Sequence, residues 1–348
     1  MLEARRLRSI ELARPLLERC GLQVNPGADY TAGVYEGEEL VATGSLNGDM
    51  IQMMAVSPDH QGEDLSAMVL THLVNYAFSR GKTALHLFTK PQRAENFTSL
   101  GFRLVARAEP YAALLEFGKP GIEEFCAHLR QVAAQDPGPA SALVMNCNPF
   151  TLGHQYLAEQ AAARSRRVYL LAVEEDKSEF PFAHRMELIR QGTAHLPNLT
   201  VLSGGRYAVS SLTFPSYFTK EENLAYAHCA IDLEIFARHL APALGVNRRF
   251  VGTEPYSPVT AIYNRTMLER LPAAGIEVVE LPRIQQGGEA VSASRVRALL
   301  QKGRLEAVRE LVPRTTYDYL LSDRARPVLE RLRERAEKEE TPPANGRF

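Results

Sequence analysis

The stretch Ala142-Leu143-Val144-Met145-Asn146-Cys147-Asn148-Pro149-Phe150-Thr151-Leu152-Gly153-His154 predicts a strand that turns sharply into a helix. Its first four residues are apolar, as in a buried strand, and the Asn-Pro pair ends that strand. Gly153 lets the backbone approach a phosphate closely, and a helix N-terminus favours negative charge. The pattern therefore predicts a nucleotide-phosphate site. The alternative is an ordinary junction in which Thr151 caps the helix and His154 is exposed.

A second motif, Val291-Ser292-Ala293-Ser294-Arg295-Val296-Arg297, opens another predicted helix. Ser292 and Ser294 are candidates for the N-cap. Two hydroxyl groups with Arg297 one turn later also make a cradle for an anion. The two roles are compatible. We expect Thr151 and His154 to meet the α- and β-phosphates of ATP, and the second motif to meet the leaving pyrophosphate.

Strand and helix patterns alternate from residue 142 onward, which predicts a doubly wound parallel sheet with ligands at the carboxyl ends of its strands. Expected strands are residues 142–145, 168–173, 199–202, 249–252 and 277–281. Expected helices are residues 155–163, 182–194, 230–239 and 258–270. The turn-rich residues 135–141 predict a linker between a domain of residues 1–134 and one of residues 142–325. Residues 326–348 are expected to be a charged, solvated helix and tail.

The N-terminal region has a strand–helix order that resembles the GNAT acetyltransferase fold, an α+β domain that holds acetyl-CoA pyrophosphate on backbone amides. The family's pyrophosphate loop reads Q/R-x-x-G-x-G/A, whereas this chain has Gln61-Gly62-Glu63-Asp64-Leu65-Ser66. Asp64 and Ser66 stand where small residues are usual, and an aspartate adds negative charge where a pyrophosphate would approach. We therefore expect Asp64 to cap the following helix. We also expect the domain to dock a partner or recognise a substrate arm rather than to transfer acetyl from CoA.

The pair T-x-G-H and S-x-S-x-x-R resembles the HxGH nucleotidyltransferase superfamily. Further segments narrow the resemblance to the citrate lyase ligase family, whose members are acetate:protein-thiol ligases. The similarity covers nearly the whole chain, and its further segments are residues 173–182, Arg185, and residues 205–210, 213–218 and 250–256.

This resemblance implies a reaction of acetate and ATP to acetyl-adenylate and pyrophosphate. Acetyl then passes to the prosthetic-group thiol of the citrate lyase acyl carrier subunit, and AMP is released. Mg²⁺ is expected with ATP and can be held by phosphates and water. No cluster of His, Cys and carboxylate residues has the spacing of metal ligands, so no protein metal site is expected.

Further site residues are expected beside those already named. Lys177 comes after the second strand, where it can bridge the attacking group and the α-phosphate; the alternative is a solvated lysine in an acidic loop. Arg206 is a candidate for contact with acetate. The remaining expected ATP or phosphate contacts are Asn146, Asn148, Gly153, Arg185, Gly252 and Glu254.

Three other function classes stay open. The first is an adenylyltransferase that forms a dinucleotide from a phosphate monoester, of the pantetheine-phosphate or nicotinamide-mononucleotide type. The second is a GNAT acetyltransferase whose second domain only senses nucleotide, and the third is a nucleotide-responsive regulatory protein. The intact T-x-G-H and S-x-S-x-x-R motifs argue against the last two.

Composition is typical of a cytoplasmic enzyme. The 348 residues are 45% hydrophobic and carry a net charge of −1, so the basic surplus of a nucleic-acid binder is missing. No apolar run approaches the roughly 18 residues of a membrane span. The four cysteines are scattered, which suits a reducing compartment. Cys147 is expected to be a passive buried thiol.

Overall fold

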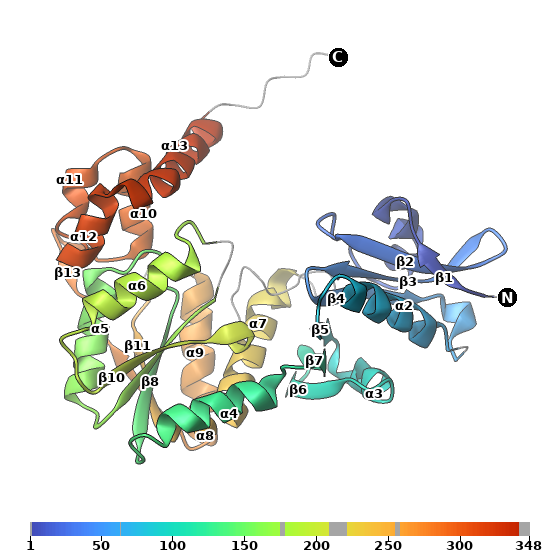
Figure 1. Ribbon diagram of the computed structural model, residues 1–348, viewed down its shortest axis with the longest axis horizontal. Coiled ribbons are helices and arrows are strands. Elements are labelled where there is room, and N and C mark those ends of the chain that lie inside the picture. Colours follow the sequence, from blue (N-terminus) through green and yellow to red (C-terminus); the bar gives the residue numbers. More distant parts are fainter. Residues whose placement is uncertain (1, 63, 175–177, 209–220, 255–257, 341–348) are drawn as a thin grey trace. The chain divides into compact units, whose positions relative to one another are not determined.

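The chain divides into two compact units in the computed structural model, which describes residues 2–62, 64–174, 178–208, 221–254 and 258–340 (Figure 1). The N-terminal unit comprises Met1–Gln131 and Phe214–His239. The C-terminal unit comprises Val132–Thr213 and Leu240–Phe348. Each unit has its own hydrophobic core.

The N-terminal unit is built on a seven-stranded sheet in the order β1-β2-β3-β4-β5-β7-β6. Adjacent strands of this sheet are antiparallel except β4 and β5. These two run parallel and pair at Met50 and Ile51 before they separate. Val69 and Leu73 of α2 are fully buried against this sheet. The strands are β1 (Ala4–Arg6), β2 (Tyr30–Glu36), β3 (Glu39–Asn47), β4 (Met50–Val56), β5 (Ala84–Thr89), β6 (Arg103–Ala108) and β7 (Ala112–Gly118). The helices are α1 (Arg14–Arg19), α2 (Leu65–Ser79) and α3 (Ala94–Thr98).

Two further helices are α4 (Ile122–Ala133) and α7 (Glu221–Ile235). Sequence patterns placed the second of these inside the second domain, but α7 packs on β6 and β7. Tyr226 stacks on Tyr111 with ring centroids 6.1 Å apart, and His239, in the π-helical turn after α7, bonds through Nε2 to the oxygen of Val105 (2.7 Å). The segment therefore groups with the sheet that it covers.

The C-terminal unit contains a five-stranded, fully parallel sheet in the order β10-β9-β8-β11-β12. β8 is central and its chain passes first to β9 and β10 on one side and later to β11 on the other, so the topological switch lies between β8 and β11. Ligands of such sheets bind at the carboxyl ends of the strands beside this switch. The strands are β8 (Ala140–Met145), β9 (Val168–Ala172), β10 (Leu199–Ser203), β11 (Val246–Gly252) and β12 (Glu277–Leu281), with a small hairpin of β13 (Gln285–Gln286) and β14 (Glu289–Ala290).

The helices of this unit pack on the sheet and on one another around a core that includes Leu143, Leu170 and Phe250. They are α5 (Leu152–Ala163), α6 (Phe182–Gly192), α8 (Ala241–Leu244), α9 (Pro258–Ala273), α10 (Ala293–Gln301), α11 (Leu305–Val308), α12 (Arg314–Leu321) and α13 (Arg326–Glu340). The prediction of a doubly wound parallel sheet in the second domain is confirmed. The charged helix α13 is not merely solvated, because Val328 and Leu332 are buried in the core.

Candidate active site

The turn after β8 carries the first motif to the carboxyl edge of the sheet. Cys147 has a left-handed backbone (φ 52°), which redirects the chain before α5 begins. Cys147 is 1% exposed, and burial raises the pKa of its thiol, so the reactive thiolate is disfavoured. The expectation of a passive buried thiol agrees with this environment.

Thr151 and His154 form a reciprocal cap at the start of α5. The Thr151 hydroxyl accepts from the backbone N–H of His154 (3.4 Å), and the backbone N–H of Thr151 donates to His154 Nδ1 (3.1 Å). The ring nitrogen Nδ1 therefore acts as an acceptor, which leaves the proton of the neutral ring on Nε2. His154 thus presents an N–H donor rather than a second acceptor.

The charge state of His154 follows from its surroundings. Burial lowers its pKa to about 4, with the positive charge of Arg283 as a second cause. The ring is therefore neutral at physiological pH. A neutral imidazole that donates from Nε2 suits a phosphate oxygen on which negative charge develops.

Gly153 lies where the first motif meets the second motif. A Cβ at this position would lie 2.9 Å from the backbone oxygen of Val291, directly before α10. The absence of a side chain thus lets the N-termini of α5 and α10 approach each other. Arg297 adds a second link, because its Nη1 donates to the oxygen of Asn148 (2.6 Å).

The start of α10 is built as the sequence suggests. The Ser292 hydroxyl caps the helix by accepting from the backbone N–H of Arg295 (3.1 Å). Ser294 is exposed, and its hydroxyl accepts from Arg297 Nη2 (3.3 Å). Ser292 therefore has a structural task, whereas Ser294 and Arg297 lie together at the edge of the site.

Asn146 and Asn148 hold the segment after β9 rather than pointing freely to solvent. Asn146 bonds to Ser178 through its side-chain amide (3.3 Å), and the side-chain oxygen of Asn148 accepts from the backbone N–H of Phe180 (3.0 Å). The two asparagines therefore tie the turn after β8 to the return of the chain after β9.

Arg185 is fully buried, with 0% exposure, although the sequence suggested a phosphate contact. Its Nη1 donates to the backbone oxygen of Asn146 (2.7 Å), to Asn146 Oδ1 (2.8 Å) and to the oxygen of Val173 (2.8 Å). Its Nε donates to the oxygen of Phe180 (3.0 Å). Buried charges are stable when paired or bonded in this way. Arg185 thus braces the ends of β8 and β9.

Arg283, which the sequence patterns did not single out, lies at the carboxyl end of β12. Its Nε donates to the oxygen of Thr253 (2.6 Å), and its Nη2 pairs with Glu254 Oε2 (2.5 Å). The Glu254 side chain is 7% exposed. Gly252, the last residue of β11, would bring a Cβ within 3.8 Å of Arg283 Cγ, which is an ordinary contact. Arg283 comes just after β12, the last strand of the sheet in the sequence, and this position is the sequence signal that would have pointed to it.

Two predicted residues, Arg206 and Lys177, remain to be placed. Arg206 is exposed on the 3-10 turn (Gly205–Tyr207) after β10, the strand beyond β9 at the same edge of the sheet. Lys177 lies outside the described residues. No three His, Cys, Asp or Glu side chains of the described residues gather as metal ligands.

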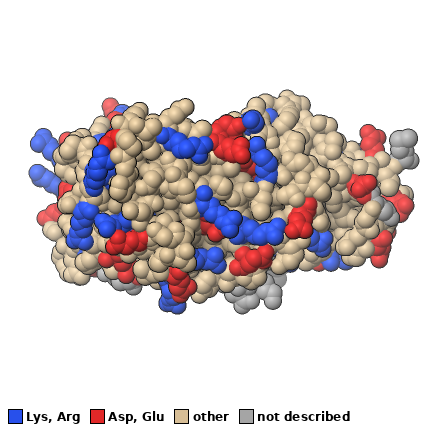
Figure 2. Space-filling view, turned by 90° about the horizontal axis from the view of Figure 1, so that it is seen from below, with Lys and Arg blue, Asp and Glu red and all other residues tan. Residues whose placement is uncertain are grey.

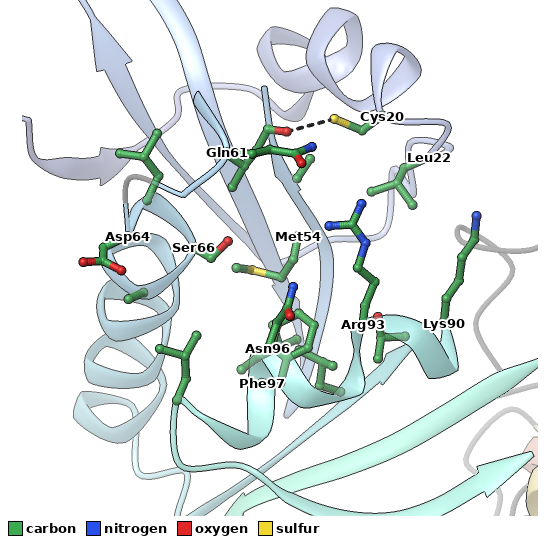
Figure 3. A pocket seen from close by; sticks show the side chains of 18 of the residues that line it. Cys20, Leu22, Met54, Gln61, Asp64, Ser66, Lys90, Arg93, Asn96 and Phe97 are labelled. Carbon is green, nitrogen blue, oxygen red and sulfur yellow. Dashed lines mark hydrogen bonds between the residues drawn. The ribbon is translucent and has the colours of Figure 1, made fainter. Parts of the chain in front are cut away.

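The N-terminal unit holds a cavity of about 680 Å³ where β4 and β5 separate. Met54, Ser66, Arg93 and Asn96 line it, and Cys20 donates from Sγ to the oxygen of Val56 (3.4 Å) at its wall (Figure 3). The volume lies within the range of small-molecule sites.

Asp64 corrects one expectation about this cavity. It occupies the N-cap position of α2, but its carboxylate makes no capping hydrogen bond and points away from Ser66 and Met54 (Figure 3). Its backbone is left-handed (φ 54°), a conformation that does not suit a side-chain cap. The prediction that Asp64 caps this helix is therefore wrong.

Charged side chains of both signs are interspersed on the face that Figure 2 shows, without a single basic patch. None of the described helices combines the length and the apolar character needed to cross a membrane.

The fold and the site together define a class: a GNAT-type domain joined to a doubly wound, parallel α/β domain, as predicted. A family model for the citrate lyase ligase C-terminal domain matches residues 140–320, and one for the GNAT acetyltransferase family matches residues 5–102. The chain belongs to the citrate lyase ligase family and is an enzyme of the ligase class.

Curated relatives agree with this assignment. The citrate (pro-3S)-lyase ligase of Klebsiella pneumoniae is 42% identical over 290 residues, which cover 82% of this chain and 84% of that protein. The enzyme of the same name from Escherichia coli K12 is 40% identical and covers 89% of each chain. A phosphopantetheine adenylyltransferase of Corynebacterium glutamicum is 28% identical over 116 residues, or 32% of this chain and 68% of that protein.

Proposed function

We propose that the protein activates acetate with ATP as acetyl-adenylate and then acetylates the prosthetic-group thiol of the citrate lyase acyl carrier subunit. Membership of the citrate lyase ligase family supports the target. The observation that carries the chemistry is the neutral His154, held with Nε2–H as a donor, beside a second helix N-terminus that bears Ser294 and Arg297.

The first step is attack of an acetate oxygen on the α-phosphorus of ATP. A new P–O bond forms, the bond to the bridging oxygen of the β-phosphate breaks, and pyrophosphate leaves. His154 stabilises the non-bridging oxygens of the α-phosphate, and Ser294 with Arg297 stabilises the leaving group. Such catalysis depends on positioning and on preorganised charge rather than on a protein nucleophile.

The second step is attack of the carrier thiol on the carbonyl carbon of acetyl-adenylate. A C–S bond forms, the C–O bond to the phosphate of AMP breaks, and the thioester, AMP and a proton result. Mg²⁺ accompanies ATP and needs few protein ligands. We place this chemistry in the cytoplasm, where thiols stay reduced. The N-terminal domain is proposed to recognise the carrier or its arm.

Other predicted residues are proposed either to contact the substrates or to position a residue that does. Lys177 bridges acetate and the α-phosphate, and Arg206 contacts acetate. Gly252 and Glu254 border the nucleotide. We propose that Arg185 acts indirectly, by positioning Asn146, because its guanidinium is bonded inside the protein.

The test measures exchange of labelled pyrophosphate into ATP. Acetate should be required for exchange, because the first step is reversible while acetyl-adenylate stays bound. Added deacetylated carrier subunit should then give AMP and acetyl thioester in equal amounts. Absence of acetate-dependent exchange, together with dinucleotide formation from phosphopantetheine or nicotinamide mononucleotide, would favour the adenylyltransferase alternative.

A further inference from the structure

The C-terminal helix α13 brings two arginines to the edge of the candidate active site. Arg331 and Arg335 are four residues apart and therefore lie on one face of the helix. Arg331 Nη2 donates to the backbone oxygen of Glu179 (3.1 Å), and Arg335 Nη1 donates to Glu179 Oε1 (2.9 Å). Val328 and Leu332 pack in the core and hold α13 in place, so the backbone that carries both arginines is fixed.

Arg297 belongs to the same cluster. Burial lowers its pKa, Glu179 opposes this shift and Arg335 adds to it, so the three side chains act on one another electrostatically. Arg297 also bonds to the oxygen of Asn148, whose side-chain oxygen accepts from the N–H of Phe180, next to Glu179. The cluster therefore adjoins the turn that carries His154.

The charges of this cluster favour an anion larger than a carboxylate. Among the described residues, the Glu179 carboxylate faces the three guanidinium groups of Arg297, Arg331 and Arg335. A pyrophosphate group carries more charge and more acceptor oxygens, and arginine forks match phosphate geometry. The Arg335 side chain is 63% exposed, so a ligand can reach it.

We propose that Arg331 and Arg335, together with Arg297, bind the pyrophosphate part of ATP, and that Glu179 occupies this place until the nucleotide displaces its carboxylate. The C-terminal helix is then part of the nucleotide site. This inference rests on the proposed function, since it assumes that ATP binds at α5 and α10.

The experiment is calorimetry of the full-length chain with inorganic pyrophosphate, and separately with ATP, at constant Mg²⁺. Arg331→Gln and Arg335→Gln should each weaken binding by roughly tenfold, as expected for loss of a charge-assisted hydrogen bond. Arg335→Lys should retain more affinity than Arg335→Gln because it keeps the charge. Arg333→Gln is the matched control: it removes the same charge from an exposed position two residues away, on another face of α13.

Glu179→Gln distinguishes ligand binding from a purely structural role. If Glu179 competes with pyrophosphate, this variant should bind it several-fold more tightly. If the Glu179–Arg335 pair only holds the loop, the variant should bind more weakly, like the arginine variants. Thermal unfolding of each variant checks that the fold is kept.

Two results would overturn the inference. One is that the Arg331 and Arg335 variants bind pyrophosphate as the Arg333 control does, while the unaltered chain binds it; the proposed function would survive that result. The other is weaker binding by Glu179→Gln. Failure of the unaltered chain to bind either ATP or pyrophosphate would instead refute the proposed function, and this inference with it.

Discussion

His154 is the side chain whose environment bears most directly on the chemistry. His154→Ala should lower turnover by about 10²–10³-fold, because one preorganised donor to the α-phosphate is lost. The fold should be kept, since the cap by the Thr151 hydroxyl remains. Acetate-dependent pyrophosphate exchange measures the loss. His195→Ala, at an exposed position paired with Glu159, is the control and should exchange normally. A near-normal rate in His154→Ala would refute the assignment.

The pH dependence follows from the same residue. The pKa of His154 is lowered from 6.5 to about 4, so the neutral ring persists down to about pH 4 and activity should have no acidic limb near 6.5. Between these values the unfolded chain binds more protons at this site than the folded chain. The contribution to stability is therefore complete above pH 6.5 and is lost as pH falls toward 4. Imidazole NMR, with His154→Ala for assignment, measures the titration; a midpoint near 6.5 would contradict the neutral ring.

At the scale of elements, the meeting of α5 and α10 depends on one glycine. Gly153→Ala would place a Cβ 2.9 Å from the Val291 backbone oxygen, so the two helix starts must separate. We expect a loss of about 1–3 kcal/mol in the free energy of unfolding and a higher KM for ATP. Chemical denaturation and exchange kinetics measure the two effects.

Gly252→Ala is the counterpart of this substitution on β11. Its added Cβ would meet Arg283 Cγ at 3.8 Å, so the free energy of unfolding should change by no more than about 0.5 kcal/mol. If the nucleotide passes close to Gly252, exchange should nevertheless fall. Unchanged stability with unchanged exchange would remove Gly252 from the site.

At the scale of the whole molecule, the cavity of the N-terminal unit leads to a prediction about CoA. We expect no appreciable binding of acetyl-CoA by calorimetry. The Asp64 carboxylate points away from Ser66, but it still puts negative charge at the start of α2, where a pyrophosphate would approach. The full chain is the right sample, since a fragment that ends at residue 134 would lack α7, which packs on β6 and β7.

A gain of affinity tests the reason for this expectation. Asp64→Gly with Ser66→Ala should raise the affinity for acetyl-CoA, and glycine accepts the left-handed backbone of residue 64 without strain. Micromolar binding by the unaltered chain would contradict the prediction and support the acetyltransferase alternative.

Local sequence alone determined where several strands and helices of the second domain lie. The apolar run before Asn146, the cap at Thr151 and the cap at Ser292 predict strand and helix starts because propensity and capping act within a few residues. The alternation of these elements was enough to predict the parallel sheet. The family resemblance likewise rests on short motifs that the chain displays directly.

Only the tertiary structure decided what depends on residues that are distant in the chain. It set Gly153 against Val291, buried Arg185 under the strand ends, brought Arg283 to the site and placed Arg335 beside Glu179. It also grouped α7 with the N-terminal sheet. These contacts follow from the packing of whole elements, which no local pattern encodes. The charged residues of α13 therefore did not reveal that Val328 and Leu332 pack into the core.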